Sequence, residues 1–211
     1  RMKWRKLGKI FDPTQFKLPH GCMGFAQSPQ AIIFESFVRI YFSTRSLDSS
    51  NGQYLSHIAF VDMKKNFRDI IAVSGHTVIE LGKLGCFDEH GIFPMNVVRY
   101  GDLIYGYTSG VNRRVSVPAD GAIGLAISRD DGYTFQRLGD GPVLAPSLHE
   151  PCIVVDPFVK VCGDTAELLR AWVIDHGRPD GVGGDSGNGG GGGHRWDARD
   201  GDLRQPGGEE P

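Results

Sequence analysis

One pattern of strands and turns occurs three times along this chain, and the repeat constrains the fold more than any other feature of the sequence. Each copy opens with a proline in front of an apolar, β-branched run. The three first runs occupy residues 28–33, 93–98 and 150–155. Matching second runs cover 39–44 and 103–108, and matching third runs cover 58–61 and 125–128. This spacing indicates a supersecondary unit that is repeated along the chain.

The runs themselves predict β-strands. Residues 38–44 are rich in β-branched and aromatic side chains, and Asn51-Gly52 marks a turn before the next strand-like run at 55–63. No convincing amphipathic helix precedes residue 164. One antiparallel sheet of three or four strands cannot bury both of its faces, whereas sheets packed radially as blades can. We therefore expect an all-β fold of the β-propeller type.

Residues 128–135 fit the S-x-D-x-G-x-T-[W/F] pattern known as an Asp-box. We expect Asp130 to accept hydrogen bonds from backbone N–H groups of the turn, and Gly132 to supply a positive φ. Such a turn joins the outer strands of a propeller blade, away from the central channel. We therefore assign no chemistry to it.

The overall charge excludes several classes of partner. The formal net charge is −2, the pI is about 6.4, and no block of Lys and Arg is present, which argues against nucleic acid. No apolar run is long enough to cross a membrane. The basic residues 1–6 are followed by Leu7-Gly8-Lys9 where a signal peptide would need an apolar core. These features predict a cytoplasmic protein with no membrane partner, and they leave the oligomeric state open.

The cysteines indicate neither a disulfide framework nor a zinc site. Cys22, Cys86, Cys152 and Cys162 form no C-x-x-C pair and have no paired histidines beside them. We expect reduced thiols, most of them buried. No metal and no cofactor are predicted.

The composition changes after about residue 161. Residues 168–174 suggest a short helix or strand, and a glycine-rich stretch follows that includes five consecutive glycines at 189–193. Such a sequence cannot bury enough apolar surface to offset its chain entropy. We therefore expect a disordered tail over residues 163–211. Because the repeat stops within a unit, we favour a frameshifted tail over a natural linker.

The chain resembles the five-bladed β-propeller superfamily of glycoside hydrolases, which includes arabinanases, β-xylosidases, invertases and levansucrases. The likeness is carried by the segments 11–13, 87–94 and 149–151 and by Asp156-Pro157. It covers residues 3–160 and is strongest to uncharacterised members. It implies a partial propeller over residues 3–162, with blades at about 10–80, about 81–140 and an incomplete one at about 141–162.

The resemblance also implies a set of catalytic carboxylates and sugar ligands. By position, Asp12 would be the nucleophile or base, Asp88 the residue that stabilises the substrate, and Glu150 the general acid. Such chemistry needs one protonated and one ionised carboxyl at the same pH. Four further residues are expected to bind an oligo- or polysaccharide: Glu89, His90, His149 and Arg113. For these four, packing or solvated loop positions remain the alternative.

Three functions stay open. The first is a glycoside hydrolase-like propeller, expected to be inactive and of low stability as a chain of three blades because the ring cannot close. The second is a non-catalytic propeller that binds glycans or other partners, suggested by Gln27-Ser28 in front of Pro29. The third is a sialidase, suggested by the Asp-box, which would need arginines around a sugar carboxylate; Arg45, Arg99, Arg113 and Arg114 are present.

Overall fold

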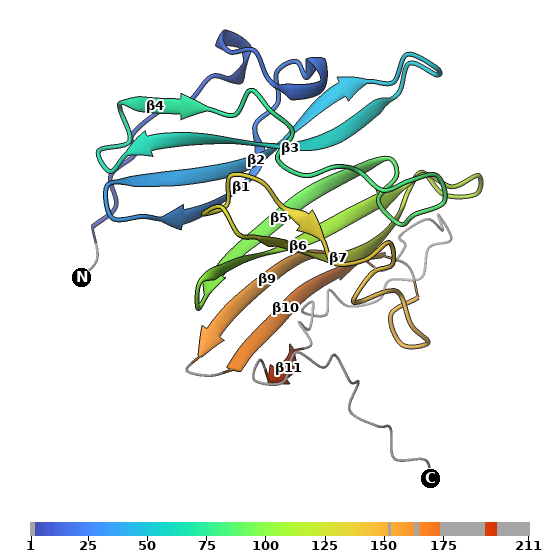
Figure 1. Ribbon diagram of the computed structural model, residues 1–211. Coiled ribbons are helices and arrows are strands. Elements are labelled where there is room, and N and C mark those ends of the chain that lie inside the picture. The colour runs from blue at the N-terminus through green and yellow to red at the C-terminus, as the bar shows by residue number, and fades with distance from the viewer. Residues whose placement is uncertain (1–2, 152, 163–164, 174–192, 198–211) are drawn as a thin grey trace.

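The computed structural model describes residues 3–151, 153–162, 165–173 and 193–197, and this part of the chain is all-β (Figure 1). Two single 3-10 turns, η1 (Pro13–Gln15) and η2 (Pro19–Gly21), precede the strands. The strands are β1 (Gln27–Ile33), β2 (Phe37–Leu47), β3 (Tyr54–Lys64), β4 (Ile70–Val73), β5 (Gly91–Tyr100), β6 (Leu103–Asn112), β7 (Asp120–Ser128), β8 (Gln136–Arg137), β9 (Ile153–Cys162), β10 (Thr165–Val173) and β11 (Gly193–Asp197).

The strands form three antiparallel units, which are β1–β4, β5–β8 and β9–β11. Single parallel bridges join neighbouring units, at Ser56–Gly91 between β3 and β5 and at Gly121–Ile153 between β7 and β9. The result is one open, mixed sheet whose three parts fan out from one another in Figure 1. The expected repeat of an antiparallel unit is therefore confirmed.

The third unit extends beyond the boundary that we expected at residue 162. Strand β10 pairs with β9 from Thr165 to Val173, and β11 pairs with β10. Residues 165–173 include Thr165, Trp172 and Val173, which have high strand propensity, and pairing with β9 and β11 places this segment inside the sheet. Other parts of the expected tail, residues 163–164, 174–192 and 198–211, lie outside the described residues.

The first unit is buried on both faces, as radial packing requires. Successive residues of β3 alternate between two clusters, because side chains along a strand point to opposite faces. Ile58 and Phe60 join a core shared with the second unit. Ala59, Val61 and Met63 join a second cluster, which Ile10, Phe11, Leu18 and Cys22 of the N-terminal segment cover. The N-terminal segment thus buries one face of the first unit, as the second unit buries the other face.

The turn between β7 and β8 has the expected geometry and also fastens two units together. Asp130 accepts hydrogen bonds from the N–H and hydroxyl of Thr134, at 2.9 and 2.6 Å. Gly132 has a φ of +79°. The hydroxyl of Tyr41, which is 1 % exposed on β2, donates to the carbonyl of Gly132 at 2.7 Å. Tyr41 is therefore a core residue that joins the first unit to the second.

The direction of the strands distinguishes the two ends of the sheet. The strands β1, β3, β5, β7 and β9 all run the same way, since alternate strands of each unit are parallel and the bridges between units are parallel too. We call the end where β1, β5 and β9 begin the rim. It also contains the turns that follow β2 and β6, and it lies at the right of Figure 1.

Among the described residues, no helix has the length and apolar character needed to cross a membrane.

Candidate functional site

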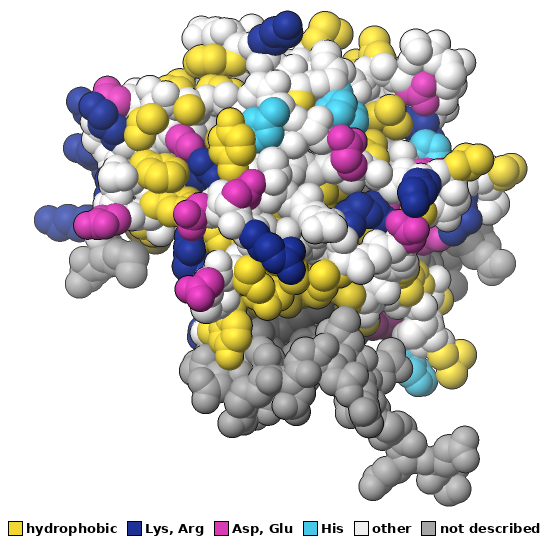
Figure 2. Space-filling model, viewed as in Figure 1, with side chains coloured by type: hydrophobic (Ala, Val, Ile, Leu, Met, Phe, Trp, Pro, Cys, Tyr) yellow, Lys and Arg dark blue, Asp and Glu magenta, His cyan; other side chains and the backbone are white. Residues whose placement is uncertain are grey.

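Six of the seven residues proposed from the sequence lie on segments of the rim, whereas Asp12 lies apart from them in the N-terminal segment. Figure 2 shows acidic, basic and histidine side chains at this side of the molecule, and further charged side chains at the opposite side. The segments before β5 and β9 and the turn after β6 carry Asp88, Glu89, His90, Arg113, His149 and Glu150. Asp12 is paired with Lys9, which lies against the turn between β3 and β4 at the opposite end of the sheet. Topology thus places at one end of the sheet residues that are up to 62 positions apart in the sequence.

The first strands of the three units lie side by side along the inner edge of the fan. The side-chain amide of Asn96 on β5 donates to Gln30 on β1 at 2.9 Å. The same side chain accepts a hydrogen bond from the backbone N–H of Val159 on β9 at 3.0 Å. Because Asn96 is 4 % exposed and bridges both neighbours, it fixes the spacing of the three inner strands.

Each inner strand has a bulge, and each bulge contains a proline. The register shifts between Gln27 and Gln30 on β1 and between Ile92 and Met95 on β5. On β9 it shifts opposite Leu169 and Ala171 of β10. The bulged pairs are Ser28-Pro29, Phe93-Pro94 and Asp156-Pro157. Proline has no N–H for the ladder, so an interrupted register suits it.

The bulge corrects our alignment of the third repeat. The sequence match placed Glu150-Pro151 in register with Pro29 and Pro94, but Asp156-Pro157 occupies that position. Glu150 instead closes a turn before β9, where its backbone pairs with that of Ser147. The alignment failed because two X-Pro pairs stand six residues apart and only pairing with β10 distinguishes them.

Asp156 is the acid that the bulges present at the inner edge. Its φ of 53° lies in the left-handed region, as does the φ of 49° at the equivalent Ser28. Its backbone N–H donates to the hydroxyl of Ser109 at 2.8 Å. Partial removal from water raises the pKa of the Asp156 carboxyl. The Asp156 side chain is exposed, and a non-glycine residue with a left-handed backbone at a bulge is typical of a functional position.

Asp88 has a different environment from the one we expected. It is 1 % exposed, and its carboxylate forms an ion pair with Arg137 of β8. Burial raises the pKa of Asp88, and the favourable interaction with Arg137 only partly opposes this effect. This contact anchors the segment before β5 on the second unit. It favours a structural role for Asp88 rather than contact with a substrate.

Asp12 caps the first 3-10 turn. Its carboxylate accepts hydrogen bonds from the N–H and hydroxyl of Thr14 and pairs with Lys9 at 2.6 Å. These partners, above all Lys9, lower the pKa of Asp12 to about 2. Asp12 is therefore ionised at neutral pH, which suits a nucleophile or a charge stabiliser and makes it a weak base.

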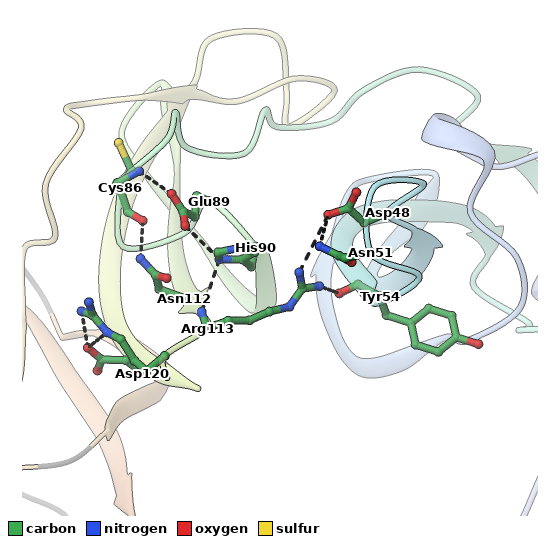
Figure 3. A network of polar contacts seen from close by, with 11 residues as sticks. Asp48, Asn51, Tyr54, Cys86, Glu89, His90, Asn112, Arg113 and Asp120 are labelled. Atoms are coloured by element: carbon green, nitrogen blue, oxygen red, sulfur yellow. Dashed lines mark hydrogen bonds and ion pairs between the residues drawn. The ribbon is translucent and has the colours of Figure 1, made fainter. Parts of the chain in front are cut away.

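Three of the four expected sugar ligands form one connected group, which we call the rim network: Asp48, Tyr54, Glu89, His90 and Arg113 (Figure 3). The Nδ1 atom of His90 accepts the backbone N–H of Arg113 at 3.3 Å and lies 3.2 Å from Glu89. The Arg113 guanidinium reaches across to the first unit, where it binds the carbonyl of Tyr54 and lies 3.9 Å from Asp48.

The rim network leaves out the fourth expected ligand. His149 is exposed on the separate segment that leads into β9. Our sequence reasoning missed Asp48, whose only signal was its place in a polar turn next to Asn51-Gly52. In the part of the chain that the structure describes, no cluster of three or more His, Cys, Asp or Glu side chains is arranged to hold a metal ion.

Comparison with known proteins gives relatives in sequence and in structure. No family profile matches the chain. An uncharacterised protein of Mycobacterium tuberculosis, present in strains CDC 1551 and H37Rv, is 32 % identical over 174 residues. The match covers 81 % of this chain and 54 % of the relative, so the chain spans about half the length of the curated relatives it matches.

Several solved structures share the fold at low identity. Sucrose-6-phosphate hydrolase from Lactobacillus gasseri aligns with a TM-score of 0.58 and 13 % identity, over 80 % of this chain and 31 % of that protein. A family 32 β-fructofuranosidase from Bombyx mori aligns with a TM-score of 0.55 and 12 % identity, over 70 % of this chain and 29 % of that protein. A family 117 glycoside hydrolase from Zobellia galactanivorans aligns with a TM-score of 0.52 and 15 % identity, over 74 % of this chain and 41 % of that protein. The described part of the chain therefore shares the fold of a part of these glycoside hydrolases, which are propeller proteins.

Proposed function

We propose that the rim of this chain binds an oligo- or polysaccharide and that Asp156 and Glu150 supply the carboxyl groups for acid/base cleavage of a glycosidic bond. The observation that carries the proposal is the acid at the third inner-strand bulge. Asp156 combines a raised pKa, a left-handed backbone and a place at the inner edge of a glycoside hydrolase fold. A carboxyl with a raised pKa stays protonated long enough to act as a general acid.

The roles differ among the carboxylates. Asp12 remains ionised and is the candidate nucleophile or charge stabiliser. Glu150 lies six residues before Asp156, on the segment that leads into the same strand. Asp88 has a structural role, because its ion pair with Arg137 anchors the segment before β5. The rim network of Glu89, His90 and Arg113 lies on the neighbouring unit and offers hydrogen-bond donors and acceptors for sugar hydroxyls.

Hydrolysis is tested with a panel of chromogenic aryl glycosides and with a reducing-end assay on polysaccharides. Loss of a general acid or base lowers the rate by about 10²–10⁴-fold, and we expect this for Asp156→Asn and Glu150→Gln. Asp140→Asn is the matched control, because Asp140 is exposed and pairs only loosely with Lys83 at 3.7 Å. Full activity in Asp156→Asn would refute the assignment.

A non-catalytic glycan-binding role is the second candidate. Its support is that Ser28 and Phe93 occupy the bulge positions equivalent to Asp156, so two of the three described bulges present no acid. Binding of a glycan by the intact chain without turnover of any substrate in the panel would favour this role over hydrolysis.

A further inference from the structure

Two arginines on the same strand have similar aromatic surroundings but different charge partners. Arg39 on β2 lies against four rings, of which Phe60 is nearest at 4.0 Å, and its guanidinium makes two 2.7 Å bonds to Asp62. Arg45 lies six residues further along β2. It is surrounded by Phe25, Phe93 and Tyr54, whose ring centres are 5.2, 5.8 and 6.0 Å from the guanidinium carbon. We call this second group the Arg45 cage.

The register of the sheet explains the difference. Arg39 is directly opposite Asp62 on β3, whereas Arg45 is opposite Ser56, which has no charge. The Nε atom of Arg45 is buried and has no hydrogen-bond partner. Within the described residues Arg45 forms no ion pair, although five other arginines each pair with an aspartate: Arg39, Arg99, Arg113, Arg114 and Arg137.

Arg45 is half-buried and its Nε is shielded from water, so its charge is only partly hydrated. Taking a charged group out of water is unfavourable unless an opposite charge or hydrogen bonds replace the water. Aromatic faces compensate only in part, by roughly 0.5–2 kcal/mol each. The Arg45 cage thus resembles the Arg39 site with the carboxylate removed, and an external oxyanion would complete it.

The cage lies where a glycan bound at the rim would pass. Arg45 is near the rim end of β2, and Phe93 is the bulged residue of the inner strand β5. Tyr54 belongs to the rim network, since its carbonyl holds Arg113. Phe25 has a φ of 55° and stands two residues before β1. Aromatic faces suit sugar rings, and the planar guanidinium suits a two-pronged bond to an oxyanion.

We propose that the Arg45 cage is a subsite for the negatively charged group of an acidic sugar, a carboxylate or a phosphate, which makes acidic glycans the substrate class of this chain. The inference rests on the proposed function, because it assumes that a glycan binds at the rim. Arg45 would form charge-assisted hydrogen bonds to the oxyanion, and Phe93 or Tyr54 would contact the sugar ring.

The test compares matched acidic and neutral sugars by titration calorimetry on the intact chain. The pairs are galacturonate with galactose, glucuronate with glucose, and glucose 6-phosphate with glucose. A charge-assisted hydrogen bond contributes enough that we expect acidic sugars to bind about tenfold tighter or more. A preference in the uronate pairs assigns the subsite to a carboxylate, and a preference for glucose 6-phosphate alone assigns it to a phosphate.

Variants show whether Arg45 is responsible. Arg45→Gln should abolish the preference for acidic sugars, while Arg45→Lys should keep part of it. Arg68→Gln, in the turn between β3 and β4 at the opposite end of the sheet, is the control and should keep it all. Circular dichroism and urea midpoints of each variant check the fold.

The outcomes separate the two proposals. Equal binding of acidic and neutral sugars by the unmodified chain overturns the acidic-sugar subsite and leaves the glycan-binding function standing. A preference that survives in Arg45→Gln also overturns it. Failure of every sugar to bind overturns the proposed function together with the subsite.

Discussion

Removal of the Asp62 carboxylate is expected to destabilise the fold by about 3–5 kcal/mol, because it leaves a buried guanidinium without its acidic partner. Arg39 is 6 % exposed and Asp62 is 7 % exposed, so water cannot replace the lost oxygens. Two hydrogen bonds of 2.7 Å are lost in Asp62→Ala. The rings around Arg39 already contact it in the native state and offer no new compensation.

Urea denaturation of a double-mutant cycle measures this cost. The cycle contains the unmodified chain, Asp62→Ala, Arg39→Met and the double variant. Methionine fills space among the aromatic rings without charge, so we expect the double variant to recover most of the stability lost in Asp62→Ala. Asp69→Ala is the matched control, because Asp69 forms an exposed 3.4 Å pair with Lys64 in the neighbouring turn. Its loss should cost no more than about 1 kcal/mol.

Two results would refute the reasoning. One is a cost below about 1 kcal/mol for Asp62→Ala, which would mean that the guanidinium finds solvent or another partner. The other is a double variant no more stable than Asp62→Ala, which would mean that the damage comes from packing rather than from the stranded charge.

Two further predictions concern a turn and a titrating core residue. Gly132→Ala should destabilise the chain by about 1–3 kcal/mol, because Gly132 has a φ of +79° and an added Cβ would overlap the Tyr41 hydroxyl. Gly139→Ala, which meets open space, should not, and an unchanged thermal melt in Gly132→Ala would contradict the assignment. Burial lowers the pKa of His57 from 6.5 to about 4. Between pH 6.5 and about 4, His57 is therefore protonated in the unfolded chain but neutral in the folded chain. Stability should therefore fall as the pH drops from 6.5 towards 4, by at most about 3 kcal/mol, and His57→Gln should reduce this slope in urea titrations at several pH values.

The strands and turns could be predicted because their signals are local. The β-branched runs at 28–33, 38–44 and 93–98 lie within strands, and Asn51-Gly52 lies in the turn between β2 and β3. The turn at 128–135 has the hydrogen bonds that Asp130 was expected to accept. In each case the backbone preference of a few neighbouring residues is sufficient, so no long-range contact has to be known.

The candidate site could be predicted only to the level of its location. Asp88 and Glu150 lie at the rim because acids before parallel strands share one end of the sheet. Asp12 lies instead in the N-terminal segment that covers the first unit. Which acid faces the inner edge could not be predicted. The choice between Glu150 and Asp156 depends on pairing with β10, and the burial of Asp88 depends on Arg137, which lies 49 residues away.

By itself, the sequence determined that this chain forms repeated antiparallel strands and that Asp88 and Glu150 precede the first strands of the second and third units. Tertiary structure alone decided that Asp156 occupies a strained bulge, that Asp88 is ion-paired inside the second unit, and that Arg45 faces rings with no acid opposite. The physical reason is the range of each interaction. Strand and turn preferences act between neighbours in sequence, whereas burial, register and charge pairing are set by residues that only the folded sheet brings together.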